Sequence, residues 1–514
     1  MQRLDTYDVC VIGSGPAGAF AANILARSHC AVAVIEAGGT WVNSRADAVL
    51  DESASTIAGG VQLGFSQQIG GSSNLWAGFA ARLNPIDFLA RPQIGAPGWP
   101  ITNADLDPFY RRLDQILGLR RDAAPHRDLM QECFAGGRLQ AHEAIILDPP
   151  FVTAGLVQMQ DGIELLTRCA AHRLIWNEQK MSIEALEYLH KPTGQWRRLN
   201  ARTFILAAGT LTNIPLLLYS LAERADRLPK VYKRIGKGFS THPKANVGTL
   251  KLNRKLPGNH PLICLETLAT HRRRYQFGLP EQVLRKKGLL NHCVRFELPG
   301  QSRLFRAFET AKRAFYDLAP ANAHERRLAT QAAGLGRRVY SAIDTMSARS
   351  LSPDRLRVRL FLDQAVRLEN RLTLSPRLSE SGLPLAAIDW RFSEEDWQNA
   401  EGFVREIAAA LTELQVGTLH YERPALPHFV GLHSHFLGGT PMGTSPDTSV
   451  VDAQLKVHGI DNLYVSGPSV FPTYGYANPF YTIAALSIRL GEHLAGALKS
   501  REKILSGPLM LCEP

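Results

Sequence analysis

The chain opens with apolar runs separated by a stretch of small residues. Val9–Ile12 is a continuous apolar run and predicts a buried parallel strand, whereas the alanine-rich Ala17–Arg27 predicts a helix. Ala31–Ile35 predicts a second buried strand, which ends at Glu36. Strand, helix and strand in this order are typical of a parallel sheet with helices packed on its faces.

Apolar and polar positions follow a different pattern later in the chain. Arg355–Leu362 alternates basic and apolar residues, as a half-buried strand does. Asn370–Leu374 and Ala387–Arg391 predict further short strands, and Glu394–Leu414 predicts an amphipathic helix. The sequence therefore combines a βαβ unit with a region of shorter strands.

Length and composition are those of a large globular protein. At 514 residues the chain can bury one large core or two. It has no apolar run of about twenty residues, so we expect no transmembrane helix. The first strand begins too close to the N-terminus to leave room for a signal peptide. The seven cysteines are scattered without a Cys-x-x-Cys pair, which argues against disulfide frameworks, zinc sites and c-type haem and favours a cytoplasmic protein.

The formal net charge is +11, and basic residues are dense between Arg272 and Arg359. Within this region, apolar residues recur at helical spacing from Leu304 to Phe315, with arginines and lysines around them. One hypothesis is peripheral contact with an anionic membrane through this basic helix. Another is recognition of an acidic or phosphorylated substrate. The interpretation we favour is a solvated, arginine-rich helical hairpin. No nucleic-acid-binding module accompanies the charge, so we expect no nucleic-acid partner.

A glycine motif, Gly13-Ser-Gly-Pro-Ala-Gly18, joins the first predicted strand to the first helix. In such a motif Gly13 allows the tight turn, Gly15 lets backbone approach a pyrophosphate, and Gly18 lets the helix pack on the strand. The helix N-terminus offers free N–H groups to phosphates. Glu36 is placed to accept hydrogen bonds from a ribose diol. The motif predicts a dinucleotide site but does not separate NAD from FAD.

A second glycine-rich segment, Gln68-Ile-Gly-Gly-Ser-Ser-Asn-Leu-Trp-Ala-Gly78, surrounds one tryptophan with small residues. Such a segment lets backbone lie flat against a large planar ligand. The alternative is an ordinary turn around a core tryptophan.

The C-terminal region carries the candidate chemistry. His435-Phe-Leu-Gly-Gly-Thr440 precedes Asn478-Pro479, which opens an apolar helix. A histidine has a suitable pKa for accepting a proton from a hydroxyl group, and an asparagine can hold the hydroxyl oxygen without competing for that proton. Pro479 costs no hydrogen bond in a first helical turn. The alternative is a core helix that Asn478 caps. Spacing to the Gly-Gly pair favours His435 over His433 as the base.

Taken together, these motifs resemble the glucose-methanol-choline (GMC) oxidoreductases, a family of FAD-dependent alcohol oxidases and dehydrogenases. The matching segments are Gly13–Gly18, Glu36–Gly39, Gly70–Gly78, Pro97–Pro100, Phe204–Gly209, Thr241–Pro243 and His435–Ala485. They cover about half of the chain well, and residues 255–430 match weakly.

The resemblance implies an α/β fold, with a Rossmann-like FAD-binding domain and a discontinuous α+β substrate domain built on an antiparallel sheet. Residues 1–92, 162–250 and 432–514 would form the FAD-binding domain, and residues 93–161 and 251–431 the substrate domain. Some members link FAD to a histidine near the second glycine-rich segment. Residues 64–90 contain no histidine, so we expect noncovalent FAD.

The resemblance also assigns roles to individual residues. His435 would be the catalytic base and Asn478 its partner. His242, in the Thr-His-Pro motif, is interpreted as structural. The predicted cofactor-binding residues are Gly13, Ser14, Gly15, Pro16, Ala17, Gly18, Glu36, Ala37, Gly71, Ser72, Asn74, Leu75, Trp76, Ala208, Gly209, Gly467, Asn478 and Pro479. Ser466-Gly467 stands where members often carry an acidic residue, so backbone N–H groups would take the place of its carboxylate.

The function implied is oxidation of an alcohol to a carbonyl, with hydride transfer to flavin N5. A general likeness to carbohydrate-active members favours a sugar, polyol or glycosylated metabolite as substrate. Oxygen, a quinone or a protein would accept the electrons. The alternative is a lyase of the same fold with a non-redox FAD. A nicotinamide-dependent dehydrogenase predicts a colourless protein, and a pure binding role leaves His435 and Asn478 unexplained.

Overall fold

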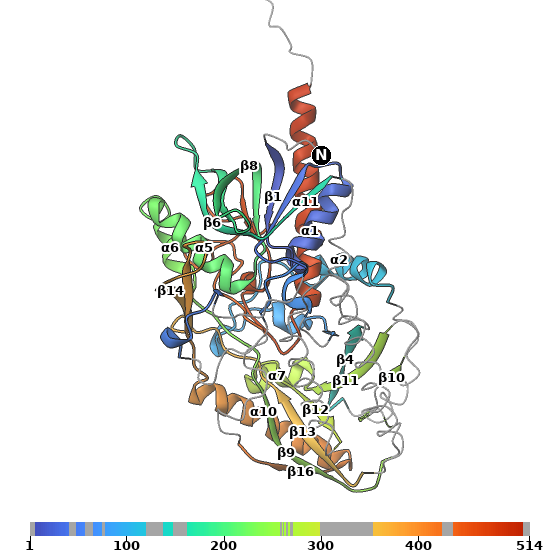
Figure 1. The fold of residues 1–514 in the computed structure, drawn as a ribbon. Helices are drawn as coiled ribbons and strands as arrows, with labels where there is room; N and C mark the ends of the chain where they lie inside the picture. Colours follow the sequence, from blue (N-terminus) through green and yellow to red (C-terminus); the bar gives the residue numbers. More distant parts are fainter. Residues whose placement is uncertain are drawn as a thin grey trace, which may run out of the picture.

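The computed structural model describes residues 6–40, 48–56, 65–74, 78–119, 137–147, 162–256, 260, 262–263, 266–267, 271–298, 353–423 and 435–506. Two sheets organise these residues. Figure 1 shows the first sheet with α1 and α11 at one end of the molecule, and the second sheet with α10 at the other. Among the described residues, no helix is both long enough and apolar enough to cross a membrane.

The first sheet is mostly parallel. Its strand order is β5 (Ile163–Thr167), β2 (Val32–Glu36), β1 (Tyr7–Ile12), β8 (Gln195–Leu206), β7 (Ile183–His190) and β6 (Cys169–Trp176), with β17 (Leu463–Val465) also paired to β8. Strands β5, β2, β1, β8 and β17 are parallel, and β6, β7 and β8 form an antiparallel meander. Strands β1 and β2 are buried almost throughout because helices and loops cover both faces.

Two helices from opposite ends of the chain pack together beside the first sheet. They are α1 (Pro16–Arg27) and α11 (Phe480–Ser506). A Cβ on Gly491 would lie 2.9 Å from Cβ of Ile24, so the absence of a side chain there permits the close approach. The remaining helices around this sheet are α2 (Asn103–Ile116), α5 (Thr210–Leu221) and α6 (Pro229–Arg234).

The second sheet is antiparallel. Its order is β16 (Gly417–Tyr421), β9 (Lys244–Leu252), β13 (Arg355–Phe361), β12 (Cys293–Glu297), β11 (His271–Gly278), β4 (Gln140–Leu147) and β3 (Phe79–Ala80), with β10 (Glu266–Thr267) beside β11. Helices α7 (Glu281–Lys287) and α10 (Glu394–Glu413) accompany it, and β14 (Arg371–Leu378) pairs with β15 (Pro384–Asp389) in a separate ribbon. Val294, Phe296 and Val358 from one face join the same buried core as Phe403 of α10.

The structure departs from the expected organisation at the start of the basic region. Arg272, Arg273 and Arg274 lie in strand β11, not in a helical hairpin, because β11 pairs along its whole length with β4. The expected basic helix from Leu304 to Phe315 falls in residues 299–352, outside the described residues. The domain boundaries stay a prediction, although β3 and most of β9 fall within the segments expected to form the FAD-binding domain and yet pair into the antiparallel sheet.

Candidate active site and cofactor cavity

The loop between β1 and α1 shows why its three glycines are not interchangeable. Gly13 has φ of +104°, and a Cβ there would lie 2.6 Å from the carbonyl oxygen of Ala207. A Cβ on Gly18 would overlap the carbonyl oxygen of Gly13. A Cβ on Gly15 would meet nothing within 4 Å. Gly13 and Gly18 therefore maintain the fold, while Gly15 leaves its side of the loop open.

Glu36 is held by three hydrogen bonds at the carboxyl end of β2. Its Oε2 accepts from the Ser14 amide at 3.1 Å and from the Ser14 hydroxyl at 2.6 Å, and its Oε1 accepts from the Gly38 amide at 2.8 Å. Burial raises the pKa of this carboxyl group, and the hydrogen bonds act in the opposite direction. The side chain is thus fixed in one orientation beside the glycine loop.

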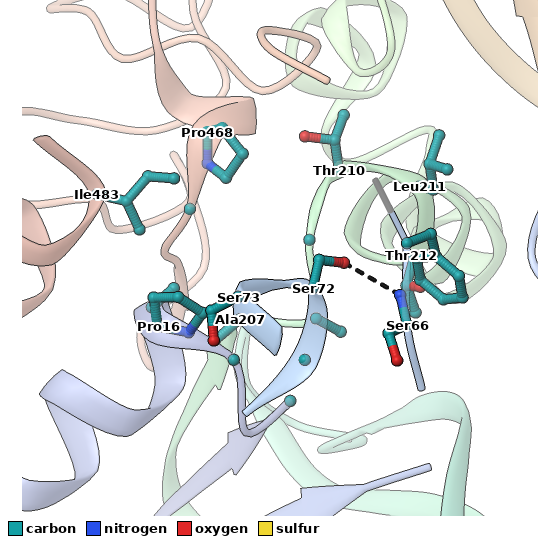
Figure 2. Close-up of a pocket in the computed structure, with 18 of the residues that line it drawn as sticks. Pro16, Ser66, Ser72, Ser73, Ala207, Thr210, Leu211, Thr212, Pro468 and Ile483 are labelled. Carbon is teal, nitrogen blue, oxygen red and sulfur yellow. Dashed lines mark hydrogen bonds between the residues drawn. The ribbon is translucent and has the colours of Figure 1, made fainter. Parts of the chain in front are cut away.

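A cavity of about 310 Å³ connects the glycine loop with the C-terminal motifs. Figure 2 shows Pro468 and Ile483 on one side of this cavity and Leu211 and Thr212 on the other. The predicted residues that line it are Gly13, Gly15, Pro16, Ala17, Glu36, Ala37, Gly71, Ser72, Ala208, Gly209, His435, Gly467, Asn478 and Pro479. Segments that are hundreds of residues apart in sequence therefore meet around one space.

Some predicted residues lie just behind the cavity wall. Ser14 holds Glu36, Gly18 packs on Gly13, and Asn74 donates from Nδ2 to the carbonyl oxygens of Ile69 and Gly71. These three residues shape the loops that line the cavity. Leu75 and Trp76 lie outside the described residues, as does His433.

Sequence reasoning missed several residues of the cavity wall. Ser66 donates its amide to Ser72 Oγ at 3.1 Å, the contact drawn in Figure 2. Cys169 and Ala171 reach the cavity from β6, and Thr210 reaches it from the start of α5. No local motif marks Cys169 or Ala171, because only the pairing of β5 with β2 brings that part of the chain beside Glu36.

The Gly-Gly turn after His435 fits against a second glycine-rich turn. A Cβ on Gly438 would overlap the carbonyl oxygen of Gly238, and a Cβ on Gly439 would overlap the Ile214 side chain. Leu437 and Ser240 exchange two backbone hydrogen bonds of 2.9 Å as an antiparallel bridge. His435 lies two residues before Leu437, so this pairing fixes its backbone position.

The same antiparallel register places His242 opposite His435. The two Nδ1 atoms lie 3.1 Å apart, and the rings are perpendicular with centroids 5.2 Å apart. On the other edge of the His435 ring, Nε2 lies 3.3 Å from Nδ2 of Asn478. His435 is therefore held between a second histidine and the asparagine that precedes α11.

With Nδ2 of Asn478 turned toward the ring, these contacts fit one tautomer of His435. An Asn478 amide that donates to His435 Nε2 requires Nε2 to carry a lone pair. The proton of neutral His435 then lies on Nδ1, which donates to His242 Nδ1. The sequence interpretation of His242 as structural overlooked this contact.

Burial keeps both histidines neutral. The pKa of His435 lies well below its usual value because of burial, with the charges of Lys244 and His242 adding to the effect. Burial lowers the pKa of His242 to about 3, and Lys244 again contributes. At neutral pH His435 Nε2, the nitrogen beside Asn478, is therefore unprotonated.

Asn478 is positioned by the loop that precedes it. Thr473 accepts from Trp99 Nε1 at 2.7 Å and donates to the backbone carbonyl of Asp87 at 2.5 Å. The Tyr474 hydroxyl donates to the Gly238 carbonyl oxygen, so this tyrosine packs and does not wall the cavity. Gly475 has φ of +58° and leaves no room for a Cβ beside the Asp87 carboxylate. The loop thus ties Asn478 to the same turn that supports His435.

Two protein-family models match this chain. The family model described as FAD dependent oxidoreductase matches residues 8–277, and the family model described as GMC oxidoreductase matches residues 367–487. The chain belongs to the GMC oxidoreductase family. It is an FAD-dependent alcohol oxidase or dehydrogenase, as the motifs predict.

Individual GMC relatives cover almost the entire chain. Paromamine 6'-oxidase of Streptomyces fradiae is 24% identical, over 96% of this chain and 92% of its own length. The 2-methyl-1,2-propanediol dehydrogenase of Mycolicibacterium austroafricanum is 23% identical, over 96% of this chain and 95% of its own. The crystal structure of pyridoxine 4-oxidase from Mesorbium loti matches with a TM-score of 0.56 at 17% identity, over 95% and 99% of the two chains. This last likeness confirms the fold.

The residues present in this GMC chain fit FAD. Gly15 lines the cavity with open space where a side chain would lie, at the N-terminus of α1, so backbone can approach a pyrophosphate. The Glu36 carboxylate lines the same cavity, where it can accept from a ribose. The cavity then continues to His435 and Asn478. Room, donors and acceptors are thus present in the order that a dinucleotide requires.

Proposed function

We propose that this GMC oxidoreductase oxidises a hydroxyl group of a sugar, polyol or glycosylated metabolite to a carbonyl, with His435 as the base. The observation that carries the proposal is the placement of His435 and Asn478 together at the cavity, with His435 Nε2 3.3 Å from Asn478 Nδ2. FAD, when bound, supplies the acceptor for the hydride, at N5 of its ring system.

His435 would receive the hydroxyl proton at Nε2. Its Nδ1–H meanwhile stays hydrogen-bonded to His242, so the ring keeps its orientation as it becomes positively charged. A neutral His242 is a suitable partner because its Nδ1 accepts this hydrogen bond without requiring a second proton. In this account His242 is a positioning residue that acts through His435.

Asn478 would hold the alcohol oxygen. Its side chain lines the cavity beside His435, and an amide can donate to an oxygen at any pH at which the base is neutral. The two side chains would therefore fix the hydroxyl group from two directions, and the carbon that bears the hydride would be oriented as a consequence.

We further propose that FAD is bound without a covalent link. The second glycine-rich segment contributes glycine and serine to the cavity, and Ser72 accepts from the Ser66 amide. Among the described cavity residues, Cys169 donates its thiol hydrogen to the carbonyl oxygen of Thr167. The Ser72 hydroxyl and the Cys169 thiol are thus both engaged in hydrogen bonds with the protein. Acid precipitation tests the proposal, since it releases noncovalent flavin into the supernatant and leaves a covalently attached flavin in the pellet.

An anaerobic absorbance titration tests the function. The purified yellow protein is mixed with a panel of sugars, polyols and simple alcohols, and then exposed to air. Bleaching of the flavin band by one class of alcohol supports the proposal and names the substrate class. Rapid recolouring in air indicates oxygen as the acceptor, and slow recolouring indicates a quinone or a protein. Turnover of a substrate without any bleaching during the reaction would instead favour the lyase alternative.

A further inference from the structure

The face of the antiparallel sheet opposite α10 is strongly basic. Alternate residues along β13, β12 and β11 point to this face, because directly paired residues in an antiparallel sheet share a side, and their partners on β9 follow with a change of parity at its bulge. We call this surface the basic face. Its charged residues are Lys244, Lys251, Arg272, Arg274, Arg295, Arg355, Arg357, Arg359 and Glu297.

The single carboxylate of the basic face is fully engaged by two arginines. Arg295 Nε donates to Glu297 Oε1 at 2.9 Å, and Arg359 lies 3.2 Å from Glu297 Oε2. Burial acts to raise the pKa of Glu297, yet Arg295 and Arg359 hold that pKa at about 2. Arg359 in turn has its pKa lowered to about 10 by burial and by its cationic neighbours. Lys244, Arg295 and Arg359 are thus three cations that share one carboxylate among the described residues.

Lys244 is a cation whose charge acts on both His242 and His435, and no carboxylate of the described residues pairs with it. Its ammonium lies 5.6 Å from the centroid of the Phe361 ring. The side chain is largely buried, and burial together with Arg295 and Arg359 lowers the pKa of Lys244 to about 8. A buried ammonium without a counter-ion is costly, and a bound anion would relieve that cost.

The basic face lies against the catalytic loop. Lys244 follows His242 by two residues, and its charge reaches both His242 and His435. Cys293 and Phe361 of the face pack with Tyr476, which precedes Asn478 by two residues. His142, on the same face, has its ring centroid 5.4 Å from that of Tyr476. The excess positive charge thus stands beside the residues proposed to hold the alcohol.

We propose that Lys244, with Arg295 and Arg359, binds an oxyanion of the alcohol substrate, either a carboxylate or a phosphate. This inference rests on the proposed function and deepens it. Ammonium and guanidinium groups make their strongest hydrogen bonds to these two anions. A substrate held there by its anion would present a hydroxyl group to His435 and Asn478. The phosphates of FAD are not the occupant that the geometry indicates, because the glycine loop that suits them lies on the first sheet.

Direct binding of inert anions tests this inference without turnover. Calorimetry measures the affinity of the FAD-loaded protein for inorganic phosphate and for acetate at pH 7, in wild type, Lys244→Met and Lys251→Met. Lys251 is an exposed residue of the same face, farther along β9 where it pairs with Arg355, and serves as the matched control. We expect Lys244→Met to weaken anion binding by about tenfold or more, the typical effect of losing a hydrogen bond to a charged group, and Lys251→Met to leave it unchanged. Equal affinity in all three proteins, or no binding to wild type at millimolar anion, would overturn the inference.

Substrate preference gives a second, independent measurement that needs no variant. Wild-type protein is titrated anaerobically with glycerol, glycerate and glycerol 3-phosphate, and with glucose, gluconate and glucose 6-phosphate. Bleaching by acids or phosphate esters at concentrations at least about tenfold below their neutral counterparts supports the inference, and the better of the two anions identifies its chemistry. If the neutral alcohols bleach the flavin at lower concentrations than the acids and phosphate esters, the anion site is refuted and the proposed alcohol oxidation stands.

Discussion

The Nδ1 atoms of His242 and His435 lie 3.1 Å apart, and only one of them can carry the proton between them. This contact determines which nitrogen of His435 is available at the cavity. It also joins two segments 193 residues apart in sequence. Four predictions follow from the arrangement around this pair and around the cavity.

Replacing the proposed base should slow the chemistry and spare the cofactor. His435→Gln removes the proton acceptor, so we expect the rate of anaerobic flavin bleaching to fall by roughly 10²–10⁴-fold. The glycine loop and Glu36 lie on the first sheet and are untouched, so the flavin absorbance per protein should match that of wild type. A variant that keeps its flavin and bleaches at the wild-type rate would exclude His435 as the base.

The bleaching rate should depend on whether the side chain at position 242 can accept a hydrogen bond, more than on the size of that side chain. In His242→Asn, the amide oxygen stands in for Nδ1 and still accepts from His435, whereas His242→Leu offers no acceptor. We expect the leucine variant to bleach at least about tenfold more slowly, and the asparagine variant to recover most of the rate. Similar losses in both variants, accompanied by similar losses of thermal stability, would point to a purely structural role.

The pH dependence of bleaching should reflect the depressed pKa of His435. Because burial and the charge of Lys244 favour neutral His435, the bleaching rate should stay constant as pH falls from 8 to below 6.5, and should decline only at more acidic pH. Removing the charge in Lys244→Met should raise the pKa of His435 and move this acid limb upward. Stopped-flow measurements across the pH range check both statements. An unchanged limb in the variant would contradict the electrostatic link.

Gly15 and Gly18, two loop positions with different surroundings, should separate cofactor binding from folding. Gly15 has φ of −65°, which suits any residue, and open space at its Cβ position. Gly15→Ala should therefore fold normally but weaken FAD binding, because its methyl group intrudes where the pyrophosphate approaches. Gly18→Ala should lower the melting temperature of the FAD-free protein, since its Cβ overlaps the Gly13 carbonyl oxygen. Thermal unfolding and FAD titration of both variants measure the difference. An alanine at Gly15 that destabilises as much as one at Gly18 would refute this division.

The sequence predicts those elements whose signal is local. Continuous apolar runs mark β1 and β2, and the glycine motif marks the turn into α1, because backbone geometry alone requires small residues there. His435 and Asn478 stand out for the same reason, since each lies beside a glycine or proline that fixes the local backbone.

Other features depend on pairing between distant segments and have no local signal. His242 faces His435 only because Ser240 pairs with Leu437. Arg295 and Arg359 share a face with Lys244 only through the register of three strands, so the charge density between Arg272 and Arg359 suggested a solvated hairpin instead. Cys169 reaches the cavity because of strand order. None of these contacts can be predicted without knowledge of the tertiary fold.

The central claim is that the protein removes a proton and a hydride from an alcohol, with His435 as the base. The most direct test is anaerobic stopped-flow reduction of the FAD-loaded protein by an alcohol that bleaches it, and by the same alcohol deuterated at the carbinol carbon. The account predicts bleaching that is slower with the deuterated alcohol and slower again in His435→Gln. A protein that binds no flavin, or one that transforms the alcohol while the flavin band stays unchanged, would contradict it.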